Sequence, residues 1–268
     1  VDIIPQERRG EGLGIYTSST SLAMATGPVI SLFMHESGIS FNQIFMTVFC
    51  VGLAGFVATS GIKPQKEVER STKKFRISNL LLKAGLPEAA VMFLLTFGYG
   101  IITVYLSIYA KEEVGITQGT GYYFTIFSAG LVTARLCSAM ILRSGKFITV
   151  FALGIISLII GFFIVAFVHN PIAFFSSAIF MGGGYGLISP TAQTMIINLG
   201  QDFERGAANA TYLTFFDLGV GAGVFCGGII AQYSNYSTAY AVSFGFTIIG
   251  LVYLLTVIRR HFYANRLR

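Results

Sequence analysis

Long apolar runs with at most one charged residue fill most of the chain. They cover residues 12–34, 37–62, 89–110, 114–134 with a continuation past Arg135 to residue 142, 147–201, and 206–258 with the single acid Asp217. A helix that crosses about 30 Å of hydrocarbon needs about 20 such residues. A short polar stretch divides each of the two longest runs, at residues 169–171 and 232–238, where a turn is expected. The pattern therefore predicts eight transmembrane helices.

The composition agrees with a protein that is stable in lipid rather than in water. Hydrophobic residues make up 54% of the 268 residues and charged residues 11%, whereas about 25% charged residues is usual in soluble domains. The chain has 31 glycines and 25 phenylalanines, which suit helices that pack closely and present bulky apolar side chains to lipid. The predicted fold class is an all-α membrane protein.

Lys and Arg residues lie almost entirely on one side of the predicted membrane. An even number of helices places both ends of the segment on the same side, and that side holds every Lys and Arg outside the helices except Lys111. These residues are concentrated in cytoplasmic loops. We therefore expect a multi-pass protein of the cell (plasma or inner) membrane, with both termini of this segment cytoplasmic. The basic residues are interpreted as a topology signal and as contacts for lipid headgroups, not as a nucleic-acid site.

A charged stretch and an internal repeat divide the chain into two bundles. Residues 1–62 are expected to form a partial N-terminal bundle of two helices, residues 63–86 a cytoplasmic linker, and residues 87–268 a C-terminal bundle of six helices. Residues 9–27 align with residues 205–223 at an offset of 196, with both segments starting at the predicted cytoplasmic side. A repeat of this length implies two equal bundles, so four helices are expected to be missing before Val1.

Six plus six helices around a basic central loop resemble the major facilitator superfamily, and three motifs carry that resemblance. The first predicted helix contains Gly14, Ala23, Gly27, Pro28 and Ser31, which resemble the antiporter motif in the fifth helix of drug/proton exchangers. Ala23 and Ser31 stand where that motif has glycines. Small residues let two helix backbones approach, and a proline bends the helix. The resemblance implies export rather than uptake, and the alternative is an ordinary kinked helix.

The other two motifs lie in the second bundle. Arg135, followed by Arg143, Gly145 and Lys146, resembles the family's loop between its eighth and ninth helices, and the Arg205-Gly206 pair resembles the start of its eleventh helix. Ala139 and Leu142 replace the usual glycine and aspartate, which weakens any gating ion pair. The resemblance implies a helical bundle of this family covering the fifth to twelfth helices. It also implies antiporter-motif or gating roles for Gly14, Ala23, Gly27, Pro28, Arg135, Arg143 and Gly145.

Asp217 is the sharpest candidate for a transport residue. It lies about 16 Å beyond Gly206 along a helix, close to the middle of the membrane. A charge at that depth costs at least about 2.5–3.5 kcal/mol, so intramembrane acids are functional candidates. We expect Asp217 to face a central cavity and to exchange a proton or pair with a cationic substrate. The alternative is an acid that a neighbouring helix satisfies.

Polar side chains at helical spacing predict a wet cavity, because lipid offers them no partners. The expected substrate-cavity residues are Asp217 and two stripes of polar side chains. One stripe consists of Thr96, Tyr99, Thr103 and Ser107, and the other of Tyr185, Ser189 and Gln193. Hydrogen bonding between helices is an alternative explanation for both stripes. Glu88 is interpreted as an acid at a helix start, and His35, His169 and His261 as surface residues.

The chemistry visible in the sequence favours a transporter. Clustered nucleophiles or metal ligands, which a membrane enzyme needs, are not seen, and no cofactor or metal is expected. We predict secondary active transport, with proton-coupled efflux of a small amphipathic molecule or drug by alternating access. The alternatives are an uptake or export permease for a sugar, metabolite or metallophore, and a truncated membrane protein without transport activity. The expected partners are the substrate, protons and the lipid bilayer, and the protein is expected to be a monomer.

Overall fold

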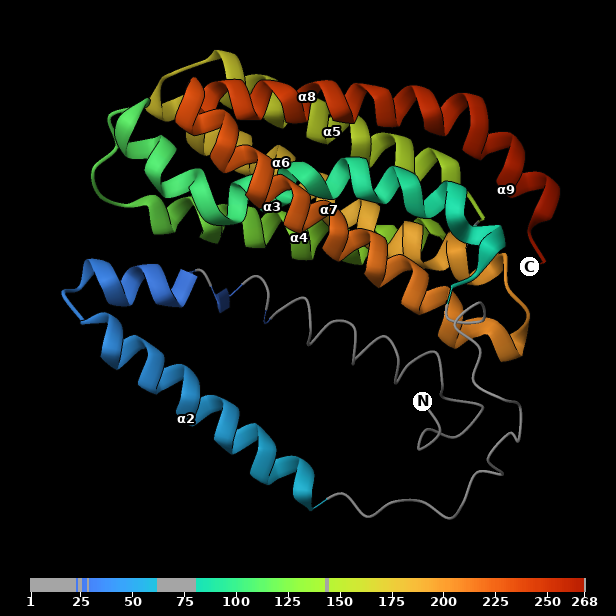
Figure 1. Cartoon of the computed structure of the whole chain (residues 1–268), viewed down its shortest axis with the longest axis horizontal. Coiled ribbons are helices and arrows are strands. Elements are labelled where there is room, and N and C mark those ends of the chain that lie inside the picture. The colour runs from blue at the N-terminus through green and yellow to red at the C-terminus, as the bar shows by residue number, and fades with distance from the viewer. Residues whose placement is uncertain (1–22, 24–25, 28, 62–80, 143–144, 268) are drawn as a thin grey trace. The chain divides into compact units, whose positions relative to one another are not determined.

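The protein is helical throughout the part of the chain that the structure describes. The computed structural model describes residues 23, 26–27, 29–61, 81–142 and 145–267, and this part contains helices and no strand (Figure 1). Seven of its helices are long and apolar enough to cross a membrane. The first predicted span, at residues 12–34, lies mostly outside the described residues, as does the first copy of the repeat. The predicted all-α membrane fold is confirmed.

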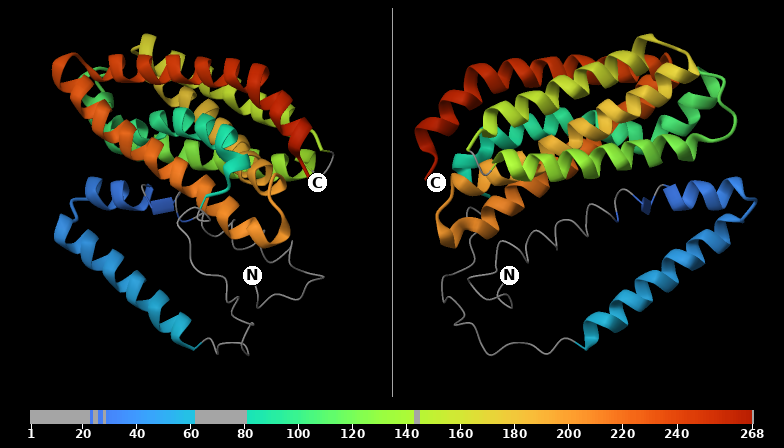
Figure 2. Two further views of the ribbon diagram at one scale, coloured as in Figure 1. Left: turned by 45° about the vertical axis from the view of Figure 1, so that its right-hand side comes forward. Right: turned by 180° about the vertical axis from the view of Figure 1, so that it is seen from behind.

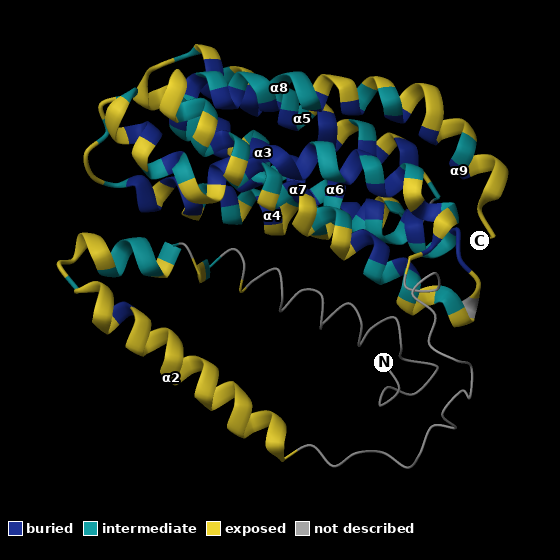
Figure 3. Cartoon of the chain, in the orientation of Figure 1, coloured by how far each residue is buried: buried dark blue, intermediate teal, exposed yellow. Residues whose placement is uncertain are grey.

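The chain divides into two units, residues 1–75 and 76–268. In the first unit, helix α2 (Phe41–Ser60) begins with a capping box in which the Ser40 N–H donates to the Gln43 side chain at 3.2 Å. Ile44 is the one buried residue of α2, and Phe45, Phe49 and Phe56 are 70%, 64% and 71% exposed (Figure 3). A helix with apolar side chains on all sides is stable in lipid, not in water.

The second unit is a bundle of six long helices. They are α3 (Leu86–Glu112), α4 (Thr120–Leu142), α5 (Phe147–Phe167), α6 (Pro171–Asn198), α7 (Arg205–Tyr233) and α8 (Tyr236–Tyr253), the last continued by a π-helical turn η5 (Leu254–Ile258) and by α9 (Arg259–Asn265). Helix α3 packs on α7 and α8, and α6 packs on α4 and α5. Helix α5 lies between α6 and α8, as Figure 2 shows from behind.

The turns between these helices follow their sequence signals with one exception. Asn170 and Asn235 cap α6 and α8, and each side chain accepts from the N–H three residues on, at 2.8 Å. Both predicted turns are therefore confirmed. Helix α4 begins at Thr120, six residues later than the apolar run that starts at residue 114. Gly115 and Gly119 adopt φ values of +79° and +84° in between, a conformation that breaks the helix.

Glycines determine how closely α3 and α7 approach. Gly219, Gly223 and Gly227 of α7 face α3, and a Cβ atom added at Gly223 would overlap the Phe97 carbonyl oxygen. Gly182 of α6 meets the Phe127 carbonyl of α4 in the same way. The bundle is therefore held by backbone-to-backbone packing, as expected where lipid provides no hydrophobic drive between helices.

A carboxylate links α3 to α8 at one end of the bundle. Glu113, directly after α3, accepts hydrogen bonds from the N–H groups of Tyr236 at 2.6 Å and Ser237 at 3.1 Å, and from the Ser237 hydroxyl. Its charge thus caps the start of α8. His169, in the turn between α5 and α6, lies 2.7 Å from the same hydroxyl and is itself exposed, as predicted for a surface residue.

Replacing Glu113 by alanine should therefore destabilise the bundle, because two backbone N–H groups of α8 lose a charged acceptor. We expect a loss of about 1–3 kcal/mol in the free energy of unfolding, measured in detergent by circular dichroism. Glu112→Ala, one residue earlier and exposed, is the matched control and should change stability by less than about 0.5 kcal/mol. Equal effects of the two substitutions would show that the cap has no special weight.

Candidate functional site

Five aromatic side chains from four helices meet within the six-helix unit. This central cluster consists of Tyr99 on α3, Phe127 on α4, Tyr185 on α6, and Tyr212 and Phe216 on α7. The Tyr99 ring lies 4.9 Å from Tyr185 and 5.9 Å from Phe216, and Tyr212 lies 6.0 Å from Phe216, between ring centroids. Tyr99 and Phe216 are half-buried and the other three are buried. The cluster therefore presents part of two rings to the outside of the unit.

Polar and charged groups surround the Tyr212 hydroxyl. The Ser189 hydroxyl lies near it, and the side chains of Arg135, Asp217 and Tyr99 lie within electrostatic reach of it. Arg135 projects from α4 and is half-buried. A cation, an acid and hydroxyl groups thus gather beside the aromatic rings. Such an arrangement can bind an amphipathic molecule with a polar or charged end.

Asp217 lies near the middle of α7 and its side chain is exposed. The neighbouring Leu213 and Leu218 are also exposed, at 46% and 55%. Helix α7 packs on α3 through its glycine face, and the Asp217 side chain lies outside that contact. An acid near the middle of a membrane-spanning helix is costly in hydrocarbon, which makes Asp217 a candidate for the functional site.

The predicted stripe on α6 lies against α3 and α7. The Tyr185 hydroxyl donates to the Leu95 carbonyl at 3.0 Å, and the Gln193 amide donates to the Asn209 side chain at 2.7 Å. Gln193 and Ser189 are half-buried. The polar groups of Tyr185 and Gln193 are therefore satisfied between helices, and Ser189 lies near Tyr212 of the central cluster.

The predicted stripe on α3 divides into residues with different surroundings. Thr96 is 0% exposed, and its hydroxyl donates to the carbonyls of Met92 at 2.8 Å and Phe216 at 3.1 Å. Hydrogen bonding between helices, the alternative explanation, is therefore the better one for Thr96, which corrects its assignment to a cavity. Tyr99 belongs to the central cluster. Thr103 is exposed and Ser107 is half-buried.

The residues assigned to the family motifs are only partly within the described chain. Gly14, Pro28 and Arg143 lie outside the described residues. Ala23 and Gly27 are helical and exposed. Gly145 adopts φ +75°, and its N–H donates to the Leu142 carbonyl at 3.0 Å in the turn before α5. A glycine is required there because side chains strain this conformation.

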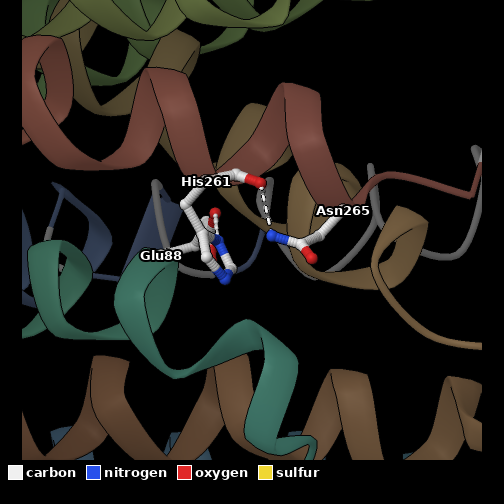
Figure 4. A network of polar contacts seen from close by, with 3 residues as sticks. All are labelled: Glu88, His261 and Asn265. Atoms are coloured by element: carbon white, nitrogen blue, oxygen red, sulfur yellow. Dashed lines mark hydrogen bonds and ion pairs between the residues drawn. The ribbon is translucent and has the colours of Figure 1, made fainter.

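Glu88 and His261 form a pair that the sequence does not predict. Glu88 is 0% exposed, and its Oε1 lies 2.9 Å from Nδ1 of His261, whose side chain is 27% exposed (Figure 4). Its Oε2 has no hydrogen-bond partner among the described residues. Asn265 donates to the His261 carbonyl at 2.9 Å. His261 is therefore a partly exposed residue with a structural partner, which its interpretation as a surface residue did not foresee, and the description of Glu88 as a helix-start acid is incomplete.

The sequence also did not identify Phe127, Tyr212, Phe216 and Asn209 as site residues. A signal existed for two of them, because Tyr212 and Phe216 are four residues apart on one helical face and lead directly into Asp217. For Phe127 and Asn209 the partners lie on other helices, and a single sequence does not show which helices meet.

The comparisons with known proteins place the chain in a family. The model of the Major Facilitator Superfamily matches residues 1–200 and 89–266. The MFS-type transporter YtbD of Bacillus subtilis is 23% identical over 243 residues, which cover 86% of this chain and 60% of that protein. The staphylopine export protein of Staphylococcus aureus is 22% identical over 260 residues, covering 90% of this chain and 64% of that protein. The MFS-type transporter YhhS of Escherichia coli K12 is 23% identical, covering 86% of this chain and 55% of that protein.

The chain thus spans about 55–64% of the length of these curated relatives. The family match covers both units, and the relatives are named as transporters or as an export protein. Together with helices of membrane-spanning length in both units, these findings show that the chain belongs to the major facilitator superfamily of multi-pass membrane proteins.

Proposed function

We propose that the complete protein exports a small amphipathic molecule, with a cationic or zwitterionic end, in exchange for protons by alternating access. The observation that carries this proposal is Asp217, an exposed acid near the middle of a membrane-spanning helix, beside the central cluster. A carboxylate at that position can bind a cation or a proton, and competition between the two couples their movements.

The neighbours of Asp217 support the substrate class. Half-exposed rings of Tyr99 and Phe216 offer apolar and cation–π contacts, and Tyr212 and Ser189 offer hydrogen bonds. Arg135 near Tyr212 adds a positive charge, which favours a substrate that also carries an anionic or electron-rich group. One relative is named an export protein, which supports the outward direction over uptake.

The proposed setting follows the distribution of charge along the chain. Lys146 precedes α5, Arg205 begins α7, and Arg259 and Arg260 begin α9, whereas Lys111 lies at the opposite end of α3. We therefore propose that the starts of α5, α7 and α9, which carry these Lys and Arg residues, face the cytoplasm in the cell membrane. The same proposal includes the division of the chain into an N-terminal bundle at residues 1–62, a linker at 63–86 and a C-terminal bundle. It also includes a monomeric protein.

The decisive experiment measures ethidium, a cationic amphipathic dye, in cells that express the full-length gene. Wild-type protein should lower ethidium accumulation, and collapse of the proton gradient should remove this effect. Asp217→Asn should lower the export rate at least about tenfold, the equivalent of one charge contact of about 1.4 kcal/mol, whereas Asp217→Glu should retain part of it. Glu112→Gln, an exposed acid at a helix end, is the control.

Two results would reject this proposal. Asp217→Asn with unchanged export and unchanged gradient dependence would remove the acid from the mechanism. Wild-type protein that is present in the membrane but leaves ethidium accumulation unchanged would reject the cationic amphipathic substrate, in favour of a sugar, metabolite or metallophore permease or a protein without transport.

A further inference from the structure

A groove lies between α5 and the last helical segment of the chain. Its volume is about 420 Å³, and its lining includes Ala152, Leu153 and Ile156 of α5, Leu255 of η5, and Arg259 and Tyr263 of α9. The central cluster draws on α3, α4, α6 and α7 instead, so the groove is separate from the proposed transport site.

Most of the groove is apolar and open to its surroundings. Leu153, Ile156 and Leu255 are 51%, 43% and 47% exposed, and α5 has the highest mean hydropathy of the candidate spans, 2.9. Ala152 has a small side chain and is half-buried, which gives the groove its depth. A surface of this kind on a membrane-spanning helix faces hydrocarbon chains.

The π-helical turn shapes one wall of the groove. It turns Leu254 and Ile258 into the core, both at 0% exposure, and leaves the next residues, Leu255 and Arg259, exposed towards the groove. Turns of this type are rare and frequently occur at functional sites.

Positive charge gathers at one end of the groove only. Arg259 lines this end and is exposed, and the Arg266 guanidinium lies 5.0 Å from the ring of Tyr263, which also lines it. Lys146 immediately precedes α5, the helix that forms the other wall. The groove thus combines an apolar channel with a cationic, phenol-bearing end, which is the complement of a lipid with a negatively charged headgroup.

We infer that this groove binds one anionic phospholipid, with an acyl chain along Ala152, Ile156 and Leu255 and the phosphate against Arg259 and Tyr263. The groove volume lies at the lower end of the about 300–1,000 Å³ typical of small-molecule sites, and its charged end favours a lipid over an uncharged apolar occupant. Assigning the lipid to the cytoplasmic leaflet rests on the proposed orientation, but the binding itself does not.

The test is native mass spectrometry of the purified chain in detergent, titrated with phosphatidylglycerol, phosphatidylcholine or inorganic phosphate. Arg259→Ala should weaken phosphatidylglycerol binding about fivefold, the effect of one Arg contact to an anionic headgroup. Arg260→Ala, the exposed neighbour outside the groove lining, should change it less than about twofold. Ala152→Phe, which fills the groove, should weaken binding of both lipids. Inorganic phosphate should not compete.

Three outcomes would overturn the inference. Equal losses in Arg259→Ala and Arg260→Ala would show diffuse attraction to headgroups. Unchanged lipid binding in Ala152→Phe, or in Leu255→Phe if the first variant does not fold by circular dichroism, would show that no acyl chain occupies the groove. Competition by inorganic phosphate would show an anion site without a lipid chain. Because none of these measurements involves transport, failure of the proposed export function would leave them interpretable.

Discussion

Replacing Gly223 by alanine is expected to prevent stable packing of the six-helix unit. The added Cβ would overlap the Phe97 carbonyl oxygen and crowd the Phe97 Cα, so the backbones of α3 and α7 must separate. Overpacking of this kind costs about 1–3 kcal/mol or more, and we expect at least about 3 kcal/mol because neither obstructing group is a flexible side chain. Thermal unfolding in detergent, followed by circular dichroism, measures the loss.

Gly221, two residues away on the same helix, provides a matched control. It is exposed, and apart from the neighbouring backbone of its own helix no atom of the described residues lies within 4 Å of its added Cβ. Gly221→Ala should therefore be neutral or stabilise the helix by up to about 1 kcal/mol, the difference in helix propensity between glycine and alanine. If both variants unfold at the same temperature as the unmodified chain, close backbone packing of α3 on α7 is not required.

Removal of the His261 imidazole should produce the second large effect, because the Glu88 carboxyl remains buried without its partner. Breaking a buried pair costs about 3–5 kcal/mol, and the lower part of this range is expected because His261 is 27% exposed. We predict that His261→Ala lowers the free energy of unfolding by about 3 kcal/mol in the same assay.

A double substitution distinguishes the pair from simple loss of packing. Glu88→Leu combined with His261→Leu should recover most of the stability, because no polar atom is then left buried. Asn265→Ala, which removes an exposed hydrogen bond to the His261 carbonyl, should cost less than about 1 kcal/mol. If His261→Ala is as stable as Asn265→Ala, the Glu88–His261 pair has no structural role.

The spans and turns were predictable because they depend on residues close together in the sequence. The polar turns predicted at residues 169–171 and 232–238 are local signals, and the structure begins a helix within each stretch. The start of α4 was not predicted, because the apolar run extends through a loop whose glycines adopt positive φ. Hydrophobicity alone reports what lipid tolerates, and backbone conformation decides where the helix begins.

The site was predictable only where one helix carries the signal. Asp217 and Tyr185 stand out as polar residues within apolar helices. By contrast, the pairing of Thr96 with the Phe216 carbonyl, and of Glu88 with His261, joins positions more than 100 residues apart. A stripe of hydroxyls looks the same in sequence whether it faces water or a neighbouring backbone, so only the packing of α3 on α7 decides the case for Thr96.

The acids at the two ends of α3 both bind the continuous helical segment that α8, η5 and α9 form. Glu113 caps the first turn of α8, and Glu88 pairs with His261 of α9, about 37 Å further along. A shift of α3 along α8 by one helical turn would break both the Glu113 cap and the Glu88–His261 pair. These two helices are therefore expected to move together as one rigid unit, so a rearrangement of the bundle would have to carry α3 and α8 as a pair.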